Sequence, residues 1–222
     1  MLTGYINHAI RKQKWRIENP CLKAEIPKEP KGRVRYLTRP EAKRLLQAAE
    51  LPYLADFIEL ALNTGCRKGE LLNLKWENID FSTRLIYLDQ TKSGDWQTVP
   101  INEEARQVLV RRMRLREQIC PNSRWVFFHM VPALNSKVGD RVKNIRRSFK
   151  SACNRAGIEN FRIHDLRHTF ASWLVMEGVP LFEVSKLLRH ASIQMTERYA
   201  HLAPDHLHDA VASIKFSAHS QH

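Results

Sequence analysis

Six side chains of this sequence have the types needed to bind a phosphodiester and attack it. In chain order they are Arg67, Lys92, His164, Arg167, His190 and Tyr199. Guanidinium groups are planar and permanently charged, so they can bond two phosphate oxygens at once and stabilise the extra negative charge of a transition state. Imidazoles can accept a proton near pH 7, and a phenol becomes a nucleophile once its proton is removed. The set therefore predicts cleavage of a phosphodiester, such as that of DNA, by a tyrosine.

The charge balance of the whole chain agrees with a polyanionic substrate. Its 36 lysine and arginine residues outnumber 23 acidic residues and give a net charge of +13. Such a field attracts polyanions, and nucleic acid is the commonest of these in cells. A length of 222 residues with 43% hydrophobic content is enough to bury the core of one large domain. A basic ribosomal or structural protein would have the same composition, so the charge favours nucleic-acid binding without establishing it.

The cysteines and the apolar runs indicate the compartment. The four cysteines, which form no Cys-x-x-Cys pair, are Cys21, Cys66, Cys120 and Cys153. This pattern fits neither a disulfide framework nor a zinc ribbon, and it favours free thiols in a reducing compartment. The first residues lack the apolar core of a signal peptide, and no run approaches the ~20 apolar residues that span a bilayer. We therefore expect a cytoplasmic protein with no membrane partner.

The N-terminal part of the chain differs from the remainder. Residues 1–35 hold nine lysines and arginines against three glutamates, and Pro20, Pro27 and Pro30 interrupt any regular element there. We expect a helix over residues 6–17, within a first segment of residues 1–18. Residues 19–36 would then be a basic linker. A solvated, partly disordered tail would have the same composition.

From residue 37 to residue 222 the pattern predicts one mainly α domain with a small antiparallel β-sheet, an α+β class. Thr38 as an N-cap with Glu41 three residues later starts a helix that should end near residue 50. Further helices are expected over residues 51–63, 68–75, 102–118, 137–156, 164–177, 180–189, 192–199 and 204–214. Residues 84–88 and 96–100 are predicted to form a hairpin, and Lys92 would lie in its turn.

Four local strings carry the six residues. They read TGCRKGE (residues 64–70), TKSG (residues 91–94), HDLRH (residues 164–168) and LRHASIQMTERYAHL (residues 188–202). In type and order these strings resemble the catalytic domain of the tyrosine recombinases, the phage integrase family. The resemblance covers roughly residues 36–216, and it is specific because four separate motifs occur in the expected order.

This resemblance implies roles for five of the residues. Arg67 and Arg167 would clamp the scissile phosphate, while His164 would bond the phosphate and accept a proton. His190 would add a further hydrogen bond, and Tyr199 would be the nucleophile. The product would be a covalent 3′-phosphotyrosine with a free 5′ hydroxyl. Because this intermediate retains the bond energy, neither ATP, a metal nor another cofactor is expected.

Lys92 has the least specific surroundings of the six. The resemblance implies that Lys92 protonates the departing 5′ oxygen, for which a compact ammonium on a flexible arm is suited. A solvated turn lysine beside Ser93 and Gly94 would have the same local sequence. A zinc site at His201, His206 and His208 is disfavoured, because these residues have no cysteine partner and no fixed spacing.

Neighbouring residues are expected to support the site. Glu70 follows Arg67 by one helical turn and would hold it in place. His168 is expected to face elsewhere on its helix as a structural residue. The family has a glycine before the histidine of the last motif, and this chain has Arg189 there. We expect Arg189 to contact DNA. We expect His190 to keep its role despite this replacement.

Two basic runs are further candidates for DNA contact. In the run over residues 141–147, we expect Lys143, Arg146 and Arg147 to contact the DNA backbone. The run over residues 111–114 could bind phosphates, and a solvated helix face fits it equally well.

The resemblance therefore implies a site-specific DNA recombinase or integrase that cleaves and rejoins strands during integration or excision of a prophage or another mobile element. Its partner would be double-stranded DNA, bound by a homotetramer. Residues 204–216 would exchange as a helix between subunits, although such a helix could equally pack on its own domain. Members of the family normally carry an N-terminal core-binding domain. The resemblance implies that residues 1–18 hold only the last helix of such a domain, so the chain would be a fragment or a truncated gene product.

Two other functions agree with parts of the sequence. A type IB topoisomerase uses similar chemistry to relax supercoils, but the HDLRH string and the chain length favour a recombinase. A non-catalytic DNA-binding remnant would have no need of all six residues.

Overall fold

The computed structural model describes residues 2–15, 17–22, 34–88, 97–132, 135–204 and 211. The chain forms two compact units, residues 1–32 and residues 33–222. In the first unit, helix α1 (Leu2–Gln13) precedes the 3₁₀ helix η1 (Pro20–Leu22). The side chain of Asn19 joins them, because its Nδ2 donates to Asn7 Oδ1 at 2.7 Å and its Oδ1 accepts from Cys21 N at 2.9 Å. The helix that we predict over residues 6–17 corresponds to α1, which begins and ends four residues earlier.

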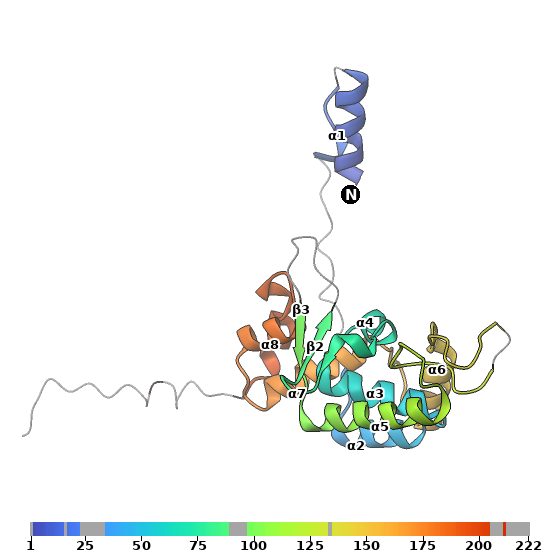
Figure 1. Cartoon of the computed structure of the whole chain (residues 1–222). Coiled ribbons are helices and arrows are strands. Elements are labelled where there is room, and N and C mark those ends of the chain that lie inside the picture. The colour runs from blue at the N-terminus through green and yellow to red at the C-terminus, as the bar shows by residue number, and fades with distance from the viewer. Residues whose placement is uncertain are drawn as a thin grey trace, which may run out of the picture. The chain divides into compact units, whose positions relative to one another are not determined.

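The second unit is mainly helical with one three-stranded antiparallel sheet, so the predicted fold class is confirmed (Figure 1). Its elements are α2 (Arg39–Gln47), α3 (Pro52–Thr64), α4 (Lys68–Leu72), η2 (Trp76–Asn78), β1 (Ile79–Asp80), β2 (Leu85–Leu88), β3 (Gln97–Pro100), α5 (Glu103–Ile119), α6 (Arg146–Arg155), α7 (Asp165–Met176), α8 (Leu181–Leu188), η3 (Ile193–Met195) and η4 (Glu197–Leu202). Helix α3 is the apolar centre and packs against α2, α5 and α7. Helix α7 in turn packs against α8 and η4, which brings the last motifs of the chain to the core.

The sheet contains the predicted hairpin and one additional strand. Strands β2 and β3 pair antiparallel, with buried Ile86 opposite buried Val99. Strand β1 pairs with the other edge of β2 and places Ile79 opposite Ile86. A strand of two residues is too short to show an alternating pattern, which is why the sequence did not predict it. The hairpin turn with Lys92 lies outside the described residues.

The helix predicted over residues 137–156 is wrong in its first half, because α6 begins only at Arg146. Before it, Asp140 Oδ2 accepts a hydrogen bond from the backbone N–H of Lys137 at 2.7 Å, and Gly139 has a φ of 89°. Arg141 then forms an isolated antiparallel bridge with Phe128. A side chain that bonds the nearby backbone competes with a helix, and tertiary pairing completes the non-helical path.

The helix predicted over residues 192–199 is also wrong, since the chain there forms the two short 3₁₀ helices η3 and η4. Ser192 makes no capping hydrogen bond with its side chain. Instead, Thr196 between the two segments is fully buried, and its Oγ1 lies 2.8 Å from His190 Nδ1. The helix predicted over residues 204–214 lies outside the described residues except for residues 204 and 211.

For the basic run over residues 111–114 we predict either phosphate binding or a solvated helix face, and Arg112 fits neither. This side chain is fully buried, and its Nε and Nη2 donate to the carbonyl of Val126 at 3.1 and 3.0 Å. Its Nη1 lies 3.7 Å from Asp56 Oδ2, while the other oxygen of this carboxylate pairs with Arg111. Arg112 therefore belongs to the core and neither faces solvent nor can reach a phosphate.

Helix α2 begins as the capping signal predicts. Thr38 Oγ1 accepts from the backbone N–H of Glu41, and Glu41 Oε2 accepts from the backbone N–H of Thr38 at 2.8 Å. Arg35 Nη2 adds an ion pair with Glu41 at 2.6 Å. The hydrogen bond from Arg35, opposed by partial burial and aided by the bonds from Thr38, lowers the pKa of Glu41 to about 2.

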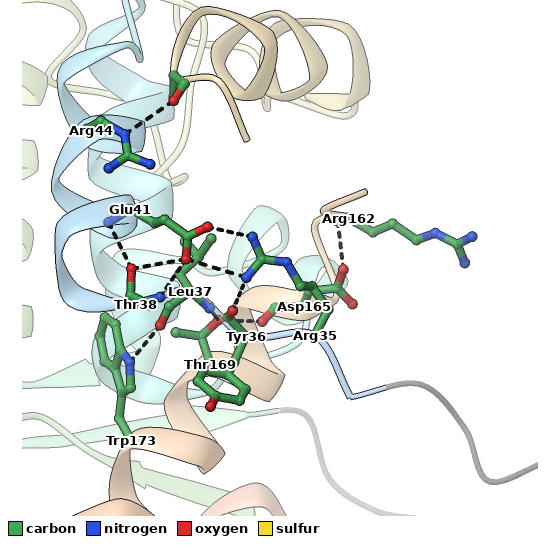
Figure 2. A network of polar contacts seen from close by, with 11 residues as sticks. Arg35, Tyr36, Leu37, Thr38, Glu41, Arg44, Arg162, Asp165, Thr169 and Trp173 are labelled. Carbon is green, nitrogen blue, oxygen red and sulfur yellow. Dashed lines mark hydrogen bonds and ion pairs between the residues drawn. The ribbon is translucent and has the colours of Figure 1, made fainter. Parts of the chain in front are cut away.

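The segment that precedes α2 is attached to α7. Figure 2 shows the backbone N–H of Leu37 donating to Thr169 Oγ1 (3.1 Å) and its carbonyl accepting from Trp173 Nε1 (2.9 Å). Thr169 Oγ1 also donates to the carbonyl of Asp165 at 2.7 Å. The entry of the chain into the second unit is thus fixed to the helix that carries the HDLRH motif.

Among the described residues, none of the helices combines the length and the apolar character needed to cross a membrane.

Candidate active site

Arg67 owes its place to the glycine that ends α3. Gly65 adopts the left-handed conformation (φ 61°, ψ 13°), which a residue with a Cβ disfavours. A Cβ at this position would lie 2.4 Å from the ring of Phe170 on α7. Glycine therefore lets the end of α3 pass close to α7, and two residues later Arg67 forms the N-cap of α4.

The Arg67 guanidinium is exposed but held by Glu70. Its Nη1 lies 2.7 Å from Glu70 Oε1, and its backbone N–H donates to Glu70 Oε2 at 2.7 Å. Burial of Glu70 would raise the pKa of this carboxyl, but Arg189 and Arg67 outweigh burial and keep the pKa below its usual value. Glu70 is therefore ionised at neutral pH and can hold the exposed side chain of Arg67 by an ion pair.

Arg167 is buried and joins three segments. Its Nη1 donates to the carbonyl of Gly65 at 2.7 Å, and its Nη2 donates to the carbonyl of Leu188 at the end of α8. Burial, followed by repulsion from Arg67 and Arg189, lowers its pKa to about 10. The guanidinium remains charged near pH 7 and places a buried positive charge between the first and the last motifs.

Two of the predicted histidines lie around this charge. His164 forms the N-cap of α7 and is exposed, whereas His190 is partly buried beside Thr196. Burial, then Arg167, lowers the pKa of both imidazoles, that of His190 to about 4. Both imidazoles are therefore neutral near pH 7. Because the Nδ1 of His190 is taken by Thr196, its Nε2 is the atom left for a ligand.

Tyr199 is fully buried on η4, and its hydroxyl oxygen lies 2.5 Å from Nδ1 of His168. Burial raises the pKa of Tyr199 to about 12, against the opposing effect of Arg198 and Arg167. Burial and the neighbouring His164 lower the pKa of His168 to about 4, so this imidazole is neutral. The hydroxyl can then donate to Nδ1 if the ring proton is on Nε2.

The expectation that His168 faces elsewhere on its helix is wrong. The ring centroids of His164 and His168 are 4.9 Å apart, and His168 contacts Tyr199 directly. The spacing of four residues could have indicated this, since such side chains share one face of a helix. Thr196 was also missed, and no local signal marked it because its contact with His190 depends on the irregular path between η3 and η4.

Arg189, for which we predict a contact with DNA, is buried in the structure. Its side chain is only 6% exposed and pairs with Glu70, with 2.6 Å between Nη2 and Oε2. The Arg189 guanidinium is therefore engaged by Glu70 inside the protein. Glu70 lies 119 positions earlier in the chain, so sequence spacing could not reveal the pair.

The basic residues predicted on and before α6 are exposed. Lys143, Arg146 and Arg147 all face solvent. Arg146 lines a cavity of about 1080 Å³ whose wall also includes Arg67 and His164. The structure therefore places α6 and the two site residues on one concave surface. Lys92 lies outside the described residues, and so do His206 and His208.

The chain matches the model of the Phage integrase family over residues 35–206. The integrase of Salmonella phage P22 is 35% identical over 211 residues, which cover 91% of this chain and 52% of that protein. The shufflon-specific DNA recombinase of Escherichia coli is 31% identical and is matched over 83% of this chain and 44% of its own length. This chain thus spans about half the length of these two relatives.

Solved structures give the same result. The catalytic domain of bacteriophage HP1 integrase is 31% identical with a TM-score of 0.60, over 81% of this chain and 95% of that domain. XerA recombinase is 27% identical with a TM-score of 0.64, over 92% of this chain and 71% of that chain. Arg67, the first of the motif residues, and Tyr199, the last, both lie inside the matched region. This chain belongs to the phage integrase family, whose members include the tyrosine recombinases.

Proposed function

We propose that this chain is the catalytic domain of a site-specific DNA recombinase that cleaves and rejoins DNA strands through Tyr199. One observation carries the proposal: segments far apart in the sequence meet at Arg167. This side chain bonds Gly65, which precedes Arg67, and Leu188, which precedes His190. Basic and neutral groups of this kind, gathered around a buried tyrosine, suit the binding and attack of a phosphodiester.

The positive groups would hold the scissile phosphate. Arg67 and Arg167 would bond its non-bridging oxygens and offset the charge that develops in the transition state. His164 and the free Nε2 of His190 would add hydrogen bonds to the same group. An anion near these imidazoles would raise their pKa values, so binding of DNA would strengthen them as donors.

We assign the proton of Tyr199 to His168 in place of His164, which the resemblance implies, because His168 is the imidazole that contacts the hydroxyl. The O–H bond of Tyr199 breaks as the proton moves to Nδ1 of His168, and the resulting phenolate forms a bond to phosphorus. The bond from phosphorus to the 5′ oxygen then breaks, and we assign protonation of that oxygen to Lys92. The product is a 3′-phosphotyrosine and a free 5′ hydroxyl.

The covalent intermediate makes the reaction reversible without an added energy source. Attack by the 5′ hydroxyl of another strand would release Tyr199 and complete one strand exchange. We assign the activity to integration or excision of a prophage or other mobile element, in line with the phage integrases among the relatives. A homotetramer on two duplexes, with exchange of residues 204–216 between subunits, belongs to this proposal.

DNA beside the cut site would lie along α6. Arg146 and Arg147 are exposed on α6 and Lys143 is exposed just before it, and the cavity beside Arg146 leads to Arg67 and His164. The net charge of +13 supports the same assignment, because it favours association with a polyanion.

A covalent trapping experiment tests the proposed reaction. The protein and its Tyr199→Phe variant are incubated with nicked duplexes drawn from host and element junction sequences, then separated on denaturing gels. An adduct with the unaltered protein only supports cleavage by Tyr199, whereas adducts with both proteins refute this nucleophile. Relaxation of supercoiled plasmid without any specific sequence would instead favour a topoisomerase activity.

A further inference from the structure

Helix α8 ends in a conformation that its last residue disfavours. Arg189 is the C-cap of α8 and has a φ of 54° and a ψ of 47°, in the left-handed region. Helices that end this way usually have glycine there, because a Cβ is crowded by the backbone. A long charged side chain at this position therefore needs an explanation in its contacts.

The guanidinium of Arg189 is buried between α8 and α4. Its side chain is 6% exposed, Nη2 lies 2.6 Å from Glu70 Oε2, and Nη1 donates to the carbonyl of Leu187 at 3.0 Å. Its Nε is buried and has no hydrogen-bond partner among the described residues. A buried charge with an incomplete set of bonds is costly, so the ion pair with Glu70 is the contact that compensates.

Glu70 shares its carboxylate between two arginines. Oε2 accepts hydrogen bonds from Arg189 Nη2 and from the backbone N–H of Arg67, while Oε1 accepts from Arg67 Nη1 at 2.7 Å. One end of this chain of contacts is buried and fixed to α8. The other end, Arg67, is 44% exposed and borders the cavity beside α6.

The turn after α8 therefore touches the two site arginines by separate routes. The carbonyl of Leu188 accepts directly from Arg167. Arg189 reaches Arg67 only through Glu70, and the next residue is His190. A shift of this turn would move the partners of both arginines together with a candidate phosphate ligand.

We propose that Arg189 is a positioning residue that orients Arg67 toward the scissile phosphate by anchoring Glu70. The inference rests on the proposed function, because it requires Arg67 to bind that phosphate. A carboxylate anchored on its buried side loses fewer orientations, so the arginine that it holds is preorganised before DNA arrives. Arg189 itself does not contact the DNA.

Single-turnover cleavage of a nicked duplex tests this assignment, once the Tyr199-dependent adduct has been established with the unaltered protein. Arg189→Gly removes the ion pair and relieves the left-handed strain, and it should lower the cleavage rate about tenfold without changing the Kd for the duplex. Arg189→Lys, which keeps a cation near Glu70, should recover part of the rate. Arg84→Gly is the matched control, because Arg84 is an exposed arginine with a φ of 55°.

A double-substitution cycle separates positioning from other roles. In a Glu70→Gln background, Arg189→Gly should cause no further loss of rate, since Arg189 acts through that carboxylate. Additive losses, an unchanged rate in Arg189→Gly, or a loss confined to Kd would each overturn the inference. Thermal melting of each variant shows whether it is folded at the assay temperature. If Arg189→Gly is unfolded there, the rate of Arg189→Lys is compared with that of the unaltered protein instead. Failure of the unaltered protein to form any Tyr199-dependent adduct would refute the proposed function instead.

Discussion

The hydroxyl of Tyr199 lies inside the protein against His168, and a pKa of about 12 shows how strongly burial opposes its ionisation. A nucleophile in this position needs a proton acceptor in direct contact. His168 is neutral at physiological pH and can accept the proton, and a bound phosphate would raise its pKa of about 4 and make it a stronger base. At the scale of single residues, the proposed activity should therefore depend on His168 as well as on the residues that we propose bind the phosphate.

We expect His168→Asn to slow cleavage by roughly 10²–10⁴-fold, the usual range for loss of a general base. The asparagine can still accept a hydrogen bond from Tyr199 but cannot take up its proton. Single-turnover rates on the nicked duplex measure this effect. A duplex with sulfur at the bridging 5′ position, whose leaving group needs no proton, should leave the variant slow. A cleavage rate of His168→Asn above that of the unaltered protein would show that His168 holds the Tyr199 hydroxyl inside the protein and does not act as its base.

Acid should destabilise the fold through the same histidine. Below pH 6.5 the unfolded chain binds a proton at His168, while the folded protein resists until its pKa of about 4. The free energy of unfolding therefore falls as the pH is lowered from 6.5 toward 4, by about 3 kcal/mol for this buried residue. Urea unfolding at several pH values measures the slope. His168→Asn should reduce that slope, and an identical slope in the variant would contradict the assignment.

At the scale of elements, the junction between α3 and α7 determines where the first arginine lies. Gly65 ends α3 in a left-handed conformation directly against Phe170, and Arg67 follows at the start of α4. The carbonyl of Gly65 also accepts from Arg167. A change at this glycine should therefore affect both the stability of the fold and the geometry of the site.

Gly65→Ala should lower the free energy of unfolding by about 2–4 kcal/mol, from the left-handed backbone and the contact with Phe170 combined. Gly69→Ala is the matched control, because an added Cβ there meets nothing within 4 Å. Within helix α4, alanine at this position should be neutral or stabilising by about 1 kcal/mol. Denaturant unfolding compares the two variants. Equal effects would show that the approach to Phe170 is unimportant.

At the scale of the whole molecule, the proposed function requires that charge brings DNA to the site. The net charge of +13 acts at long range, and the exposed arginines of α6 lie next to the cavity that reaches Arg67 and His164. Release of counterions from DNA should therefore make binding strongly dependent on salt. The paired and buried arginines, such as Arg112 and Arg189, add to the net charge but should not take part in this effect.

Substitution of Arg146 and Arg147 together by alanine should reduce the slope of log K against log salt concentration by about 2, or about 1 for each phosphate that is no longer bound. Fluorescence anisotropy of a labelled duplex at several salt concentrations measures the slope. Arg155→Ala on the same helix is the control, because Arg155 bonds the carbonyl of Ala48 and pairs with Glu50. An equal reduction by the control would assign the effect to net charge alone.

The sequence by itself determined the features that depend on neighbours along the chain. The capping box of Thr38 and Glu41, the end of α3 at Gly65, and the pairing of β2 with β3 follow from short-range rules, and the structure has all three. The identities of the six candidate site residues also came from local strings.

The tertiary structure alone decided which side chains meet. The contact of His168 with Tyr199 joins residues 31 positions apart, and the burial of Arg189 depends on Glu70, 119 positions away. The chain before α6 is irregular because it pairs with Phe128 from another segment. In each case the deciding energy comes from packing and ion pairs between distant segments, and no local propensity or spacing encodes which partner will be there.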